Sequence, residues 1–117
     1  MRSCLHCALR RALEVEGPAL AARRLTVLLG RSDPVWLPVA GGRVYRRLRR
    51  LFQEVLARAD AGSPVRLAVI VQDGKGHVEL TAAFRREGSW TVRMVEFPRY
   101  VGAALPGGFV EGLPVAG

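Results

Sequence analysis

The sequence predicts an α+β fold, a two-layer sandwich in which an N-terminal helix and an amphipathic arginine-rich helix pack on an antiparallel sheet of three to five strands. Two observations lead to this prediction. Residues 43–59 repeat apolar side chains at the spacing of one helix face, and residues 65–97 alternate apolar and polar side chains between turn signals. The resulting three-stranded C-terminal meander must cover one face, and the preceding helix has the apolar stripe to do so.

The N-terminal part is expected to contain short elements. Residues 4–15 carry apolar side chains at helical spacing, and Gly17-Pro18 is expected to end this helix before a second helical turn at 19–24. The apolar run 25–29 predicts a strand, with a helix as the alternative. Residues 35–39 are expected to pair back on it as an edge strand, because Pro38 has no hydrogen to donate to a sheet ladder.

The segment from Arg43 to Ala59 gives the clearest helix prediction. Its apolar stripe consists of Val44, Leu48, Leu51, Val55 and Ala59. Arginines occupy the opposite face and its flanks. Gly62 is expected to follow the end of the helix, because glycine suits the left-handed conformation found there.

The meander that follows has three segments separated by turns. Residues 65–72 and 77–85 are joined by Asp73-Gly74-Lys75-Gly76, which is a hairpin signal. A second turn over 86–89 leads into the strand 90–97. We therefore expect residues 1–99 to form a single α+β domain and residues 100–117 to form a Gly/Pro/Ala-rich apolar tail. That tail either packs on its own domain, remains disordered or docks on a partner.

The charge of the chain favours an anionic partner. The net charge is +8, and the basic residues are seventeen arginines and one lysine. Residues 1–63 hold twelve of the arginines against five acidic residues, so the excess lies in that half. A GC-rich coding sequence would also produce this arginine bias, which leaves an inert solvated surface as an alternative. No segment is expected to span a membrane or act as a signal peptide, so a cytoplasmic location is expected.

The two cysteines form an isolated CxxC motif, Cys4 and Cys7. A structural zinc site needs four ligands, and a redox motif normally follows a strand. We therefore expect two ordinary reduced thiols. A metal half-site completed by a second copy and redox chemistry are the alternatives.

Catalytic patterns are absent from the sequence. His77 is expected to be a solvated imidazole beside a turn, and Asp73, Lys75 and Glu79 occur in the wrong order for a metal-dependent nuclease. The chain is accordingly expected not to be an enzyme, and no cofactor, metal or small-molecule substrate is inferred.

The leading hypothesis is a small basic protein that binds nucleic acid, RNA or DNA, without catalysis. Guanidinium groups on the exposed helix face would contact phosphates, and the predicted binding residues are Arg43, Arg46, Arg47, Arg49 and Arg50. The alternative is an interaction or accessory assembly protein, possibly a homodimer, that uses the basic helix and the apolar tail to engage another protein.

Overall fold

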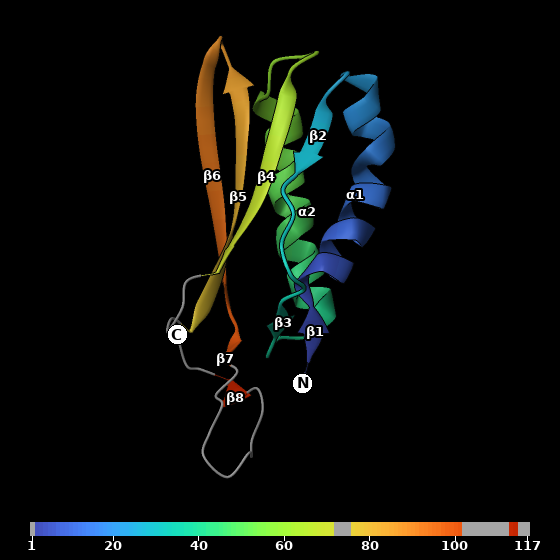
Figure 1. Ribbon diagram of the computed structural model, residues 1–117. Helices are drawn as coiled ribbons and strands as arrows, with labels where there is room; N and C mark the ends of the chain where they lie inside the picture. Colours follow the sequence, from blue (N-terminus) through green and yellow to red (C-terminus); the bar gives the residue numbers. More distant parts are fainter. Residues whose placement is uncertain (1, 72–75, 102–112, 115–117) are drawn as a thin grey trace.

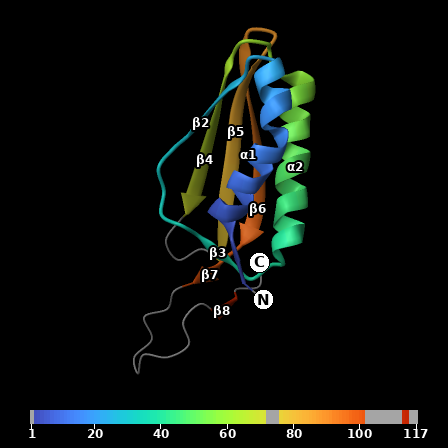
Figure 2. The ribbon, with the colours of Figure 1, turned by 90° about the vertical axis from the view of Figure 1, so that its right-hand side faces the viewer.

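Two long helices cover one face of a four-stranded sheet in the computed structural model, which describes residues 2–71, 76–101 and 113–114 (Figure 1). Figure 2 shows the two helices side by side on that face. The elements of these two layers are α1 (Leu5–Ala22), β2 (Thr26–Leu29), α2 (Gly41–Arg58), β4 (Pro64–Val71), β5 (His77–Arg86) and β6 (Ser89–Pro98). The predicted α+β two-layer sandwich is therefore confirmed. Among the described residues, no helix is both long enough and apolar enough to cross a lipid bilayer.

The sheet has the strand order β2-β4-β5-β6. The predicted meander is present, since β4 pairs antiparallel with β5 and β5 pairs antiparallel with β6. The sheet as a whole is mixed, however, because β2 runs parallel to β4. Parallel strands need a long crossover connection between them. Here α2 is part of that connection, because it lies between β2 and β4 in the chain. The predicted turn at 73–75 lies outside the described residues.

The segment expected to pair with β2 pairs elsewhere. Within it, β3 (Trp36–Leu37) is antiparallel to β1 (Ser3–Cys4), at the N-terminal end of α1. The amide of Leu5 donates to the carbonyl of Val35 at 2.9 Å, and Leu37 is fully buried. Because β3 pairs with β1, and β2 pairs with β4, the prediction that 35–39 pairs with 25–29 is wrong.

Helix α1 continues through the proline that was expected to end it. Pro18 lies inside the helix, and Leu20, two residues further on, is almost fully buried. Proline removes one backbone hydrogen bond and disturbs the turn before it. Burial of the apolar face beyond Pro18 favours continuation of the helix, since most helical stability in proteins comes from tertiary packing.

The core lies between the helix layer and the sheet. Phe52 is fully buried at the centre of the α2 stripe, which also comprises the buried residues Val44, Leu48, Leu51 and Val55. The sheet contributes alternate residues of its strands, as a half-buried sheet must: Val65, Leu67, Val78, Leu80, Ala82, Phe84 and Phe97. The stripe predicted from periodicity is therefore the surface that joins the layers.

The tail beyond residue 99 is described only in part. Its described portion pairs β7 (Tyr100–Val101) with β8 (Leu113–Pro114). Residues 102–112 and 115–117 lie outside the described residues. The division into a domain at 1–99 and a tail at 100–117 stays a prediction.

The C-terminal end of α2 is held by the side chain of the residue that follows α1, Arg23. The guanidinium of Arg23 donates to the carbonyl of Leu56 and, at 2.5 Å, to the carbonyl of Ala59. These carbonyls are among those that a helix leaves without an internal donor. Gly62 follows in the left-handed conformation, with φ +77°, as predicted. Its amide donates to the carbonyl of Arg23 at 3.0 Å, which ties the two helix ends together.

Replacing Arg23 should destabilise the fold through these carbonyls. We expect Arg23→Ala to lower the free energy of unfolding by about 1–3 kcal/mol, because two partly buried acceptors lose a charged donor. Urea denaturation followed by circular dichroism measures this change. Arg31→Ala, in the exposed loop after β2, is the matched control and should change stability by less than about 0.5 kcal/mol. Equal stabilities of the two variants would contradict the proposed role of Arg23.

Asp60 fixes the hairpin between β5 and β6 to the end of α2. Its two carboxylate oxygens accept from the amides of Glu87 at 2.8 Å and Gly88 at 2.9 Å. These hydrogen bonds, from Gly88 and then Glu87, lower the pKa of Asp60 below its ordinary value of 3.8. The turn needs this support because Glu87, which is not a glycine, has a φ of +51°.

The contribution of Asp60 should depend on pH. A carboxyl group with a lowered pKa in the folded state binds fewer protons there than in the unfolded chain, so its stabilisation is present above pH 3.8 and is lost as the pH falls through the folded-state pKa. We expect Asp60→Asn to lower the melting temperature at pH 7 and to have little effect near pH 2, as measured by thermal unfolding. Asp33→Asn, on an exposed loop, is the control. If Asp60→Asn lowered the melting temperature as much near pH 2 as at pH 7, the ionised carboxylate could not be the cause of the difference.

Candidate functional site

A groove lies between α2 and the edge strand β6. It has a volume of about 240 Å³ and is lined by Arg47, Arg50, Leu51, Glu54, Arg93, Met94 and Val95. Spacings of three and four residues place the α2 members on one side of the helix. Strand β6 supplies Arg93 and Val95 from its helix-facing side, because alternate residues share a face. Helix and strand thus bring together residues that lie about 40 apart in the chain.

Among the described residues that line the groove, Glu54 is the only acidic one, and it lies close to arginines. Its Oε1 atom lies 2.5 Å from Nε of Arg93 and 3.9 Å from Nε of Arg58. Three arginines against one carboxylate leave the groove lining positively charged. Arg50 makes no hydrogen bond or ion pair with another described residue, so its guanidinium is available to a ligand.

Arg47 is held at the groove by β6. Its Nη1 atom donates to the backbone carbonyl of Glu96 at 2.7 Å, and its guanidinium lies 4.7 Å from the ring centre of Phe97. The first contact satisfies a carbonyl on an edge strand, where backbone groups lack a neighbouring strand. Arg47 therefore has both a structural role and a place in the groove.

The five arginines predicted as one binding surface do not stay together. Arg47 and Arg50 line the groove. Arg49 turns towards α1, where its Nη2 atom lies 2.8 Å from Oε1 of Glu16, and this hydrogen bond raises the pKa of Arg49 above its ordinary value. Arg46 is exposed and donates to the carbonyl of Gly42 at 3.3 Å, and Arg43 is exposed on the first turn of α2.

Two groove residues, Glu54 and Arg93, were missed by the sequence analysis. Glu54 follows Arg50 by four residues, so a helical projection places the two side chains on the same side. Arg93, Val95 and Phe97 are alternate residues of the predicted third strand and therefore share one face. Apolar Val95 and Phe97 assign that face to the side of the helices. Both signals were present in the sequence, but nothing in either segment alone indicates that they meet.

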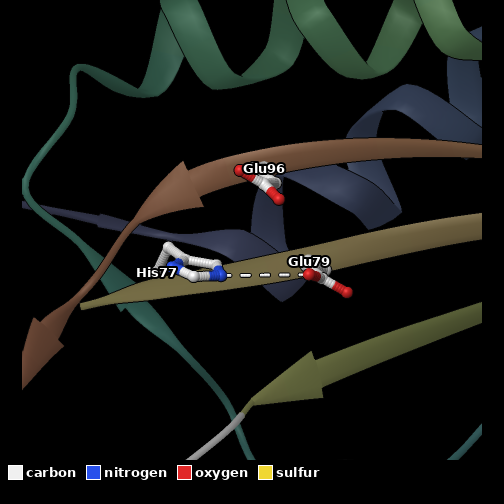
Figure 3. A group of neighbouring side chains, drawn as sticks. All are labelled: His77, Glu79 and Glu96. Carbon is white, nitrogen blue, oxygen red and sulfur yellow. Dashed lines mark ion pairs between the residues drawn. The ribbon is translucent and has the colours of Figure 1, made fainter. Parts of the chain in front are cut away.

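A second group of titratable side chains lies at the start of β5 and near the end of β6 (Figure 3). His77, Glu79 and Glu96 each have a possible ligand atom within 4.8 Å of the others, and Nε2 of His77 is 3.8 Å from Oε1 of Glu79. Glu79 and Glu96 are direct cross-strand partners, an unfavourable arrangement for two carboxylates. Imidazole and carboxylate are ligand types that a divalent metal accepts. Glu96 was not singled out from the sequence, although the predicted meander places it near Glu79.

The CxxC motif begins α1. The amide of Cys7 donates to Sγ of Cys4 at 3.3 Å, so Cys4 caps the helix, and neither cysteine forms a disulfide. A side-chain hydrogen bond with the thiol of Cys4 is the main cause of a raised pKa at Cys7. A reactive thiol requires a lowered pKa. The geometry therefore agrees with ordinary reduced cysteines.

Sequence comparison finds no family model and no curated protein that matches the chain. Comparison with solved structures does find similar folds. The mycobacterial sensor histidine kinase MprB matches with a TM-score of 0.62 at 15% identity, over 74% of this chain and 55% of its own. The catalytic domain of histidine kinase ThkA, in a nucleotide-free form, matches with a TM-score of 0.63 at 8% identity, over 71% and 56%. Full-length ShkA in complex with AMPPNP matches with a TM-score of 0.54 at 18% identity, over 68% and 17%.

The fold is that of histidine kinase catalytic domains. The chain spans about half the length of the MprB and ThkA structures that it matches. Identities of this size establish the shared arrangement of helices and strands, and a fold alone does not determine function.

The likeness corrects the function predicted from the sequence. A non-catalytic nucleic-acid-binding protein was expected, but the similar structures are catalytic domains of kinases. The expectation that the chain is not an enzyme is contradicted by the same finding. Neither a nucleic acid partner nor the absence of a small-molecule substrate is supported. The error came from treating the arginines of α2 as one surface, whereas they divide between α1, solvent and the groove.

Proposed function

We propose that the chain is a nucleotide-binding domain built on the histidine kinase catalytic fold, and that the groove between α2 and β6 receives the phosphates. The observation that carries this proposal is the convergence of Arg47, Arg50 and Arg93 on one groove. It is supported by the similar fold of ShkA, whose structure contains the ATP analogue AMPPNP.

The chemistry of the groove suits a polyphosphate. Each guanidinium is a planar fork of donors that matches two phosphate oxygens, and it remains charged at all physiological pH values. Arg50 lies on the helix and Arg93 on the strand, so the two can approach a phosphate chain from opposite sides. The apolar side chains of Leu51 and Val95 between them limit competing water, which strengthens charge pairing.

Glu54 gives the groove a place for the cation that accompanies a nucleotide. Magnesium is usually bound by one or two carboxylates together with substrate phosphates. In the described structure the Glu54 carboxylate instead holds Arg93. Arrival of a magnesium nucleotide would exchange this ion pair for a carboxylate–magnesium contact and an arginine–phosphate contact, so no charge would be left without a partner.

The size of the groove limits what enters it. A volume of about 240 Å³ lies below the roughly 300–1,000 Å³ that is typical of small-molecule sites. The groove would hold the phosphates, with the ribose and base extending beyond it. Phosphoryl transfer depends chiefly on positioning and electrostatic stabilisation. Such a domain would present the terminal phosphate to a nucleophile carried by another segment or by a protein partner, such as the partner or second copy predicted from the sequence.

Charge reversal at Arg50 should weaken nucleotide binding. We expect Arg50→Glu to raise the Kd for magnesium AMPPNP about tenfold or more in isothermal titration calorimetry, because a charged hydrogen-bond donor to phosphate is replaced by a repelling carboxylate. Arg46→Glu is the matched control, since it makes the same charge change on the same helix but lies outside the groove lining. It should change the Kd by less than about threefold.

Three further outcomes bear on the proposal. Equal losses in the two variants would indicate a diffuse attraction to the basic helix and would contradict a site in the groove. Absence of measurable heat with millimolar magnesium AMPPNP, for a protein shown to be folded by circular dichroism, would overturn nucleotide binding itself. Displacement of AMPPNP by inorganic tripolyphosphate but not by adenosine would support phosphate recognition by the arginines.

A further inference from the structure

The side of the sheet that faces away from the helices carries a large exposed apolar area. Both helices lie on the same side, so this second side is uncovered by any described helix (Figures 1 and 2). Strand β6 exposes Trp90, Val92 and Met94 there, with 44%, 58% and 50% of their surfaces accessible. Strand β2 adds Leu28, which is 49% exposed and is paired in register with Arg66. We call this side the open sheet face.

Charges of opposite sign lie at the two ends of the open sheet face. Arg66 and Arg85 lie at one end, where their guanidiniums are 5.2 and 5.4 Å from the ring centre of Trp90. Glu79 and Glu96 lie at the other end as cross-strand partners. Between them, the pairs Ala83–Val92 and Thr81–Met94 form a mostly apolar middle.

Among the described residues, neither carboxylate at the acidic end pairs with an arginine or a lysine, in contrast to Glu16 and Glu54. Glu16 and Glu54 are each paired with arginine. Glu79 has only the imidazole of His77 at 3.8 Å, and the carboxylate of Glu96 has no ion pair within the described part of the chain. Two carboxylates directly opposite each other on adjacent strands repel. A cation from outside the described fold would relieve this repulsion.

We propose that two copies of the chain pack together through the open sheet face, with their strands running in opposite directions. A two-fold axis across the strands, midway between the Thr81–Met94 and Ala83–Val92 pairs, brings the acidic end of each copy over the basic end of the other. The interface then contains the same contact between an acidic end and a basic end twice. A symmetric dimer requires this self-complementarity. The apolar middle of each copy, centred on Val92 and Met94, covers that of the other, as in face-to-face sheet packing.

The composition of the face favours this occupant over a metal ion. A divalent ion bound by His77, Glu79 and Glu96 would neutralise the carboxylates, but it would leave Trp90, Val92 and Met94 in water. A second copy accounts for both the charges and the apolar side chains. Tryptophan, methionine and arginine are also the residue types that are enriched in protein interfaces.

Sedimentation equilibrium of the full chain over a concentration series tests this proposal. We expect a monomer–dimer equilibrium, and we expect Val92→Glu to raise the dimer dissociation constant about tenfold or more, since it places a charge at the centre of the interface. Val15→Glu is the matched control: Val15 is 47% exposed on α1, and the same change there should alter the constant by less than about threefold. A monomer at all concentrations, or equal effects of the two variants, would overturn the proposal.

A charge exchange tests the orientation of the two copies. Arg85→Glu and Glu79→Arg should each weaken the dimer, and the double variant should recover at least part of the loss, because the axis places Arg85 of one copy over Glu79 of the other. Independent, additive losses would contradict the antiparallel arrangement. Loss of the dimer on addition of EDTA would identify a bound divalent metal as its cause and would likewise contradict it. Val92 lies outside the lining of the groove, so this result and the nucleotide result can fail separately.

Discussion

The packing of the apolar stripe of α2 against the sheet is the interaction on which the rest of the structure depends. Phe52 and its neighbours on α2 are buried against alternate residues of β4, β5 and β6. Full burial of each large apolar side chain contributes about 1.5–3 kcal/mol, so this stripe supplies a large share of the driving force for folding. It also determines the orientation of α2, because the side of the helix that carries Arg47, Arg50 and Glu54 is then directed to the edge of β6.

The candidate site follows from this orientation. An arginine on α2 can line the groove only if it lies beside the buried stripe on the β6 side, which selects Arg47 and Arg50 from the five arginines that begin the helix. Arg49 lies on the opposite side and pairs with Glu16 of α1, so it joins the helices to each other. The same basic sequence thus provides a structural ion pair, an exposed surface and the lining of the candidate groove. The arginine count alone could not distinguish these three roles.

The parts of the fold that were predictable from the sequence are those in which a periodic pattern of apolar residues continues over a long stretch. The stripe of α2 spans several turns, and each strand of the meander alternates over eight or more residues, so a local pattern sufficed. Pairing of β3 with β1 was not predictable, because two-residue strands show no period and their partners are far apart in the chain. The continuation of α1 past Pro18 depends on burial of Leu20, which is a tertiary effect. Of the residues that line the candidate groove, the sequence singled out Arg47 and Arg50, whereas Glu54 and Arg93 are brought together only by a contact between α2 and β6.

We propose that this protein, with its histidine kinase catalytic fold, binds nucleotide phosphates at the groove between α2 and β6. A two-dimensional ¹H–¹⁵N NMR titration of the full chain with magnesium AMPPNP tests it most directly, because it locates the affected backbone amides without any substitution. We expect the largest shifts, and saturable ones, at residues 47–54 and 93–95, on both walls of the groove. Saturable shifts confined to α1 or to the open sheet face, or no shifts at millimolar nucleotide, would contradict it.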